Sequence, residues 1–296
     1  MEFTVIVKAI LWMSGTLLSF CLMAVGAREL SGEIHTSQVM LFRSVLGLLV
    51  ICSILLITQN NRGFLTTRIG LHGLRNTFHF AGQYGWLLGI TVLPLAEVFA
   101  LEFTVPLWTA MIAWLFLGES ITARKLAAIG LGLAGVLVIL KPGVEVFNWY
   151  SLIVLAAAFC YAISHASTKS LSNTESPLTI LFYMCLIQLP IGFMFALNNW
   201  TAPVGMQWFW LVIVGLTALS AHFCMTKAMQ YAEVSTVVIL DFLRLPAIGM
   251  VGALVYGESV EVSLFVGALI MLIGNLLIMF KPQRNPQKMS GGDAPS

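Results

Sequence analysis

The chain has 296 residues, of which 59% are hydrophobic and only 9% are charged. Soluble domains carry about 25% charged residues, so the composition argues against both a soluble enzyme fold and a disordered chain. The formal net charge of +2 comes from scattered Lys and Arg residues without a basic stripe, which argues against a nucleic-acid-binding protein. The composition therefore predicts an integral membrane protein that is covered mostly by lipid.

Ten apolar segments are long enough to cross the membrane, since a helix needs about 20 residues to span about 30 Å of hydrocarbon. The connections between them are short, and only residues 283–296 are predicted to be a disordered tail. The ten predicted spans are 5–26, 37–58, 72–92, 95–117, 123–141, 149–169, 177–198, 207–228, 234–256 and 261–281. The predicted fold class is an all-α integral membrane protein with ten transmembrane helices.

The distribution of positive charge predicts the orientation, because loops rich in Lys and Arg stay on the cytoplasmic side. With the N-terminus inside, only Arg28 and Lys141 of the fifteen Lys and Arg residues fall in outside connections. Two more, Arg43 and Arg244, lie within spans, and the others fall on the cytoplasmic side. We therefore expect both termini in the cytoplasm of a cell whose inner membrane holds the protein.

Three short motifs occur twice in the same order, which indicates an internal repeat. They are Ala96-Glu97-Val98 and Ala232-Glu233-Val234, Gly118-Glu119-Ser120 and Gly257-Glu258-Ser259, and Lys141-Pro142 and Lys281-Pro282. Each copy holds five spans, an odd number, so the second copy enters the membrane upside down. The predicted organisation is a first repeat over 1–143, an inverted second repeat over 144–282, and a cytoplasmic tail over 283–296. Inverted repeats are a recurring architecture of secondary transporters.

The motifs also resemble a known family. Leu93-Pro94-Leu95-Ala96-Glu97-Val98, Phe103-Thr104-Val105-Pro106, Leu117-Gly118-Glu119 and the run from Gly135 to Gly143 follow the order found in EamA-type transporters of the drug/metabolite transporter superfamily. Phe242-Leu243-Arg244-Leu245-Pro246 with Tyr256-Gly257-Glu258 resembles the second EamA repeat. This resemblance implies two five-helix repeats and a central cavity lined mainly by spans 1, 3, 4, 6, 8 and 9. It does not imply one substrate.

Charged residues inside spans are candidates for function, because each costs about 2.5–3.5 kcal/mol to insert near the bilayer centre. Arg43 and Glu102 lie at similar depths below the outer ends of their spans, so we expect an ion pair that acts as a structural clamp or as a gate. Asp241 and Arg244 are three residues apart on one helix face and close to the midplane. They are predicted to bind substrate, with internal pairing as the alternative.

Other polar and aromatic residues inside spans complete the predicted site. His79 and Gln83 belong to a polar stripe on the third span, together with Arg75 and Trp86, that should face the protein interior. Buried core packing is the alternative for each of these side chains. Pro106 and Pro246 occupy corresponding positions in the two repeats and are predicted hinges. The predicted substrate-binding residues are Arg244, Asp241, His79, Gln83, Tyr84, Trp12, Trp108, Tyr161, His165 and His222.

The sequence favours a secondary transporter with no cofactor and no metal site, which works by alternating access as a monomer or homodimer. Its expected partners are a small-molecule substrate, the lipid bilayer and protons as coupling ion. The main substrate prediction is an amino-acid-like or carboxylate-bearing metabolite. The alternative is an organic cation, a vitamin or a nucleotide-like metabolite such as S-adenosylmethionine or riboflavin. A membrane-embedded lipid-phosphate enzyme is the competing class, but such enzymes usually need clustered carboxylates for Mg²⁺, and the chain has only two Asp residues.

Overall fold

A computed structural model describes residues 2–116, 123–140, 148–172, 174–231, 240–241, 243–259 and 261–279. The predicted tail 283–296 and the motif residues 118–120, 141–142, 232–234 and 281–282 lie outside these ranges. In chain order the helices are α1 (Glu2–Glu29), α2 (Thr36–Ile57), η1 (Asn61–Phe64), α3 (Ile69–Val92), α4 (Leu95–Glu102), α5 (Val105–Phe116), α6 (Ala123–Leu140), α7 (Trp149–Ser172), α8 (Pro177–Ala196), η2 (Leu197–Asn199), α9 (Met206–Tyr231), α11 (Arg244–Tyr256) and α12 (Val262–Met279).

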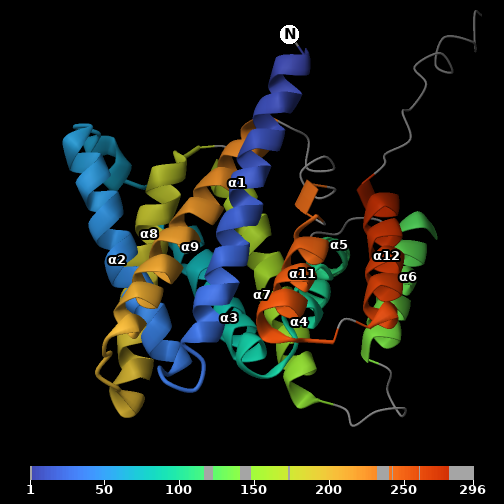
Figure 1. Ribbon diagram of the computed structural model, residues 1–296. Helices are drawn as coiled ribbons and strands as arrows, with labels where there is room; N and C mark the ends of the chain where they lie inside the picture. The colour runs from blue at the N-terminus through green and yellow to red at the C-terminus, as the bar shows by residue number, and fades with distance from the viewer. Residues whose placement is uncertain are drawn as a thin grey trace, which may run out of the picture.

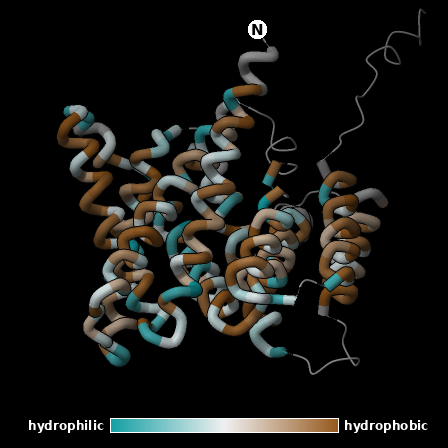
Figure 2. The backbone as a smooth tube through the Cα atoms, viewed as in Figure 1, coloured by the Kyte–Doolittle hydropathy of each residue, from teal (hydrophilic) through white to brown (hydrophobic). Residues whose placement is uncertain are grey.

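The chain folds as an all-helical membrane protein, as its composition predicts. Within the described ranges, five stretches are helical, long and apolar enough to cross a bilayer: Val7–Glu29, Thr36–Ile57, Trp149–Ser172, Pro177–Asn199 and Met206–Ala228. Figure 2 shows hydrophobic residues along most of the helical surface, with hydrophilic residues mainly near helix ends and in connections. These five helices are half of the ten predicted spans, so the number of ten stays a prediction.

The predicted continuous span 95–117 is wrong in one respect, because it is broken into α4 and α5. The break falls at Phe103 and Thr104, and Pro106 is the second residue of α5. Pro lacks the backbone N–H that a helix interior needs, so a continuous helix through Pro106 is disfavoured. The same residue is well placed in the first turn of a new helix, here α5. At the break, Asn275 of α12 donates to the Phe103 carbonyl at 3.1 Å. Pro246 has a similar position as the third residue of α11.

Helices from the two halves of the chain pack against each other in pairs, as Figure 1 shows. The most extensive packing joins α1 with α9, α3 with α7, α6 with α12 and α2 with α8, and α4 also packs against α11. If the five spans of one predicted repeat are exchanged for those of the other, the α1–α9 pair becomes the α7–α3 pair. The other three pairs become themselves. This is the contact pattern that a two-fold relation between the halves requires.

Small residues bring α6 and α12 close together. A Cβ atom at Gly135 would lie 2.7 Å from the carbonyl oxygen of Gly267, and one at Gly267 would lie 2.7 Å from that of Gly135. Backbone atoms cannot move aside as a flexible side chain can, so both positions need a residue without Cβ. This packing holds α6 and α12 together beside the rest of the bundle (Figure 1).

Candidate functional site

A cavity of about 90 Å³ lies between the two halves of the bundle. The helices around it are α1, α3, α4, α5, α7, α9 and α11, which correspond to the six spans that the family resemblance implies. Its side chains are mostly aromatic or charged. They are Phe20, Met23, Trp86, Glu102, Phe103, Val105, Pro106, Tyr161, His165, His222, Met225, Asp241 and Arg244.

Three of these residues, Glu102, Asp241 and Arg244, form a buried charged triad. One nitrogen of Arg244, Nη2, donates to Asp241 Oδ2 at 2.7 Å and to Glu102 Oε1 at 3.3 Å. Trp86 Nε1–H donates to the other oxygen of Glu102 at 2.9 Å. The predicted contact between Asp241 and Arg244 is therefore present. Because two carboxylates face one guanidinium, the triad with both acids ionised carries a net charge of −1.

Aromatic rings surround the triad. The Arg244 guanidinium carbon lies 4.5 Å from the ring centre of Phe20, 5.2 Å from that of Phe99 and 5.4 Å from that of Phe103. These distances fall within the range of cation–π attraction. Even so, Arg244 Nε and Nη1 and Asp241 Oδ1 are buried without a hydrogen-bond partner in the described part of the protein. Such unused donors and acceptors beside a cavity are available to a ligand.

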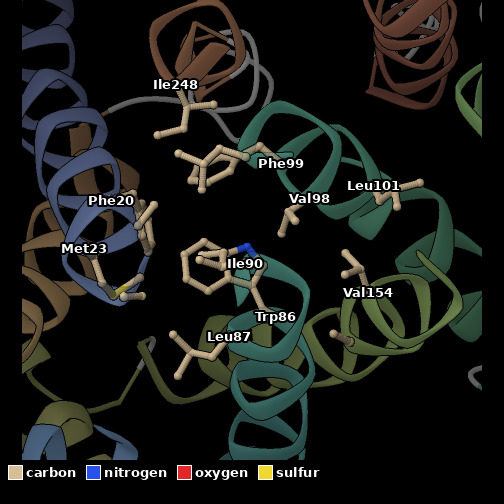
Figure 3. Close-up of a cluster of buried hydrophobic side chains, with 14 of the residues drawn as sticks. Phe20, Met23, Trp86, Leu87, Ile90, Val98, Phe99, Leu101, Val154 and Ile248 are labelled. Atoms are coloured by element: carbon tan, nitrogen blue, oxygen red, sulfur yellow. The ribbon is translucent and has the colours of Figure 1, made fainter. Parts of the chain in front are cut away.

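A fully buried apolar layer lies next to the cavity. On α3, Ile90 lies between Trp86 on the cavity wall and Leu93 at the helix end. On α4, Val98 and Phe99 lie between Glu102 and the start of the helix, and Ile248 of α11 packs in the same hydrophobic cluster. Figure 3 shows these side chains next to Phe20, Met23 and Trp86.

Polar contacts hold the helix ends together beyond this apolar layer. Arg28 of α1 lies 2.9 Å from Glu258 and donates to the Leu93 carbonyl at 2.6 Å. Glu258 also accepts the backbone N–H of Leu95 at 2.9 Å, which caps the start of α4. Arg28 and Glu258 come from opposite halves of the chain, so their contact ties the halves together at this end.

The predicted ion pair between Arg43 and Glu102 is not formed. Arg43 Nη2 donates to Gln188 Oε1 at 2.8 Å, whereas Glu102 is held by Arg244 and Trp86. The reason is the packing of their helices: α2 packs mainly on α8 and α9, while α4 packs mainly on α11 and α7. Equal depth in the membrane did not make these residues neighbours.

A polar network runs from Arg43 toward the cavity. Gln188 Nε2 lies 2.8 Å from His79 Nδ1, and the His79 ring centre lies 4.9 Å from that of His222, which is on the cavity wall. The polar stripe predicted on the third span does face the interior, because Arg75, His79 and Gln83 are all buried.

Half of the predicted substrate-binding residues lie on the cavity wall: Asp241, Arg244, Tyr161, His165 and His222. His79 and Gln83 are buried behind it. The remaining three are absent from the wall and pack against phenylalanines, with ring centres 5.9 Å apart for Trp12 and Phe223, 6.3 Å for Tyr84 and Phe195, and 5.7 Å for Trp108 and Phe159.

Sequence reasoning missed several wall residues, including Phe20, Met23, Phe103 and Met225. Nothing distinguishes a Phe or Met on a cavity wall from one in the core, because both types are common in buried packing. Phe103 had one usable signal, its position as the first residue of the family motif Phe103-Thr104-Val105-Pro106. Among the described residues, no three His, Cys, Asp or Glu side chains are grouped closely enough to hold a metal ion.

Two stretches of the chain, residues 7–141 and 148–280, match the model of the EamA-like transporter family. A riboflavin transporter of Vibrio cholerae is 30% identical over 269 residues, which cover 89% of this chain and 90% of that one. An S-adenosylmethionine uptake transporter of Rickettsia felis is 25% identical over 273 residues, or 92% of each chain. A protein of known crystal structure is similar with a TM-score of 0.64, covering 91% of this chain and 96% of that one; at 16% identity it supports the fold alone.

Proposed function

The chain belongs to the EamA-like transporter family, and from that premise we propose that it moves a positively charged, heterocyclic metabolite of the S-adenosylmethionine type across a bacterial inner membrane. It is a multi-pass transporter of the drug/metabolite superfamily. The substrate is proposed from two supports: the site's charge and the names of relatives. Relatives are named for S-adenosylmethionine and for riboflavin, which favours the alternative substrate class of the sequence analysis over the amino-acid-like one.

The placement of two carboxylates, Glu102 and Asp241, around one arginine is the observation that supports a cation, because the triad has excess negative charge when both acids are ionised. Arg244, the residue expected to bind a substrate carboxylate, already shares one nitrogen between Asp241 and Glu102. The excess negative charge lies among aromatic rings, where a sulfonium or ammonium group gains from both the carboxylates and the ring faces. A purine ring would stack against Trp86 or Tyr161. Riboflavin, the second candidate, has an aromatic ring system but no positive charge to match the triad.

The size of the cavity indicates a closed state. Sites for drug-sized molecules occupy about 300–1,000 Å³, whereas this cavity has about 90 Å³. We propose that the halves rock apart to admit the substrate, with Pro106 and Pro246, in the first turns of α5 and α11, as hinges. We propose that separation of Arg28 from Glu258 opens the cavity on the side of the apolar layer. Protons, taken up at the cavity histidines His165 and His222, are the proposed coupling ion.

The proposed topology is two inverted five-helix repeats, 1–143 and 144–282, with both termini in the cytoplasm. The pairing of helices across the halves supports it. A reporter tag inserted after Arg124 should be cytoplasmic, and one inserted after Ser259 should lie on the opposite face. Tags that report the same face would contradict the inverted arrangement.

Uptake into proteoliposomes tests the substrate. Purified protein should accumulate labelled S-adenosylmethionine, and excess unlabelled riboflavin should not compete. Liposomes with the Arg244→Ala variant serve as the inactive control, because that change removes the centre of the triad. Saturable riboflavin uptake without S-adenosylmethionine uptake would overturn the cation assignment in favour of the second candidate.

A further inference from the structure

Two buried arginines outside the charged triad have no carboxylate partner within the described ranges. Arg43 is 4% exposed and Arg75 is 3% exposed. Arg43 donates to the neutral amide of Gln188, and Arg75 donates to the Thr168 hydroxyl at 2.8 Å and to the Asn76 side chain. A buried charge without a counter-charge is costly, so a guanidinium in this position calls for an anion.

The hydrogen bonds around Gln188 fix which nitrogen of His79 carries the ring proton. Gln188 Oε1 accepts from Arg43, so the amide nitrogen of Gln188 faces His79 Nδ1. An amide nitrogen only donates, and His79 Nδ1 must therefore accept. The proton of the neutral imidazole is then on Nε2, and this N–H has no acceptor in the described part of the chain.

Three unused donors lie on two neighbouring helices, and two of their residues, Arg43 and His79, both contact Gln188. They are Arg43 Nη1 on α2, and His79 Nε2 and Gln83 Nε2, which are four residues apart on α3. His79 is 1% exposed and Gln83 is 2% exposed, so bulk water cannot satisfy them. Buried donors are nearly always paired in folded proteins, and donors without nearby acceptors make a site for an anion.

We propose that Arg43, His79 and Gln83, with Arg75 adding positive charge, form an anion-binding site one side-chain layer from the cavity. The site takes a carboxylate or a halide. It is joined to the cavity through the contact of His79 with His222. One source of the anion is the carboxylate of the substrate, whose cationic end would be held by the charged triad. This assignment rests on the proposed function. A free chloride ion is the other source of the same chemistry.

The test uses the full chain in detergent and follows its thermal unfolding. Sodium chloride and sodium acetate are titrated against the sodium salt of a bulky sulfonate buffer at constant ionic strength. At about ten times the dissociation constant, the anion should raise Tm by about 2–4 °C. The rise should disappear in Arg43→Gln. It should persist in the matched control Arg68→Gln, because Arg68 bonds Ser170 and Thr174 outside this site.

A second arm separates the two sources of the anion. The dissociation constants of S-adenosylmethionine and of its decarboxylated form are measured for the wild type and for Arg43→Gln. If the substrate carboxylate binds here, Arg43→Gln weakens S-adenosylmethionine by about ten-fold or more, and leaves the decarboxylated form unchanged. An anion-dependent Tm without this difference would assign the site to a free inorganic anion.

The proposal is overturned if neither arm responds to Arg43→Gln. Should Arg43→Gln fail to fold, Gln83→Leu replaces it, because that variant removes one donor and keeps every charge. A smaller loss of the anion-dependent rise in Tm and a smaller loss of affinity for S-adenosylmethionine are then expected. The absence of both would also overturn the site. If neither nucleoside ligand binds at all, the proposed substrate is wrong, and the anion arm still decides whether the site exists.

Discussion

Glu102→Gln separates recognition of a cation from packing of the cavity. Glutamine has the shape of glutamate, so Trp86 keeps an oxygen acceptor 2.9 Å away, and Arg244 keeps Asp241 at 2.7 Å. The side-chain NH2 of glutamine then faces Arg244 Nη2, which is also a donor, so the longer contact of 3.3 Å between Arg244 and residue 102 loses both its charge and its hydrogen bond. With both acids of the wild type ionised, the net charge of the triad changes from −1 to zero.

The expected rise in KM follows from the loss of the Glu102 carboxylate as a charged partner of the substrate. A hydrogen bond to a charged group contributes about 1.5–3 kcal/mol, and about 1.4 kcal/mol is a factor of ten, so KM for S-adenosylmethionine should rise about 10- to 100-fold. The assay is initial uptake into proteoliposomes over a range of substrate concentrations, together with the dissociation constant in detergent. Tm should fall by less than about 4 °C, because the shorter ion pair and the Trp86 contact remain.

Glu97→Gln is the matched control for this measurement. Glu97 lies on the same helix, accepts from the Ser151 hydroxyl at 2.8 Å and is not on the cavity wall. Its KM should equal that of the wild type. An unchanged KM in Glu102→Gln, or an equal rise in both variants, would refute the assignment of the triad to cation binding.

Three further substitutions test the fold around the cavity. Gly135→Ala should lower Tm by about 2–8 °C through overpacking against α12. Gly130→Ala on the same helix should leave Tm unchanged, because no atom lies within 4 Å of the added Cβ. Equal losses of Tm in thermal unfolding would count against the close approach of α6 and α12. Glu258→Gln loses its charge contact with Arg28, so a cysteine introduced at Ile90 should react faster with a membrane-impermeant maleimide; an unaltered rate would mean that this contact does not hold the end closed. Asn275→Leu removes the hydrogen bond that joins α12 to the Phe103 carbonyl at the helix break and should lower Tm by about 2–6 °C. A variant as stable as the wild type would mean that this hydrogen bond does not stabilise the packing of α12.

The sequence by itself determined that the chain is a membrane protein of the EamA type. Membrane location follows from composition, which needs no knowledge of contacts. The polar stripe on α3 and the contact between Asp241 and Arg244 were also predictable, because residues three or four apart on one helix share a face whatever surrounds them. The resemblance to the EamA family implied which spans line the cavity, and the lining residues come from those spans.

Only the tertiary structure decided which distant charges meet. Arg43 and Glu102 lie at similar depths because depth depends on the number of residues from the end of a helix. Whether two residues touch depends instead on which helices are neighbours and on how each is rotated about its axis. Packing between segments far apart in the chain sets both. That packing placed Glu102 beside Arg244 and left Arg43 with Gln188, so the ion pair expected between Arg43 and Glu102 does not form.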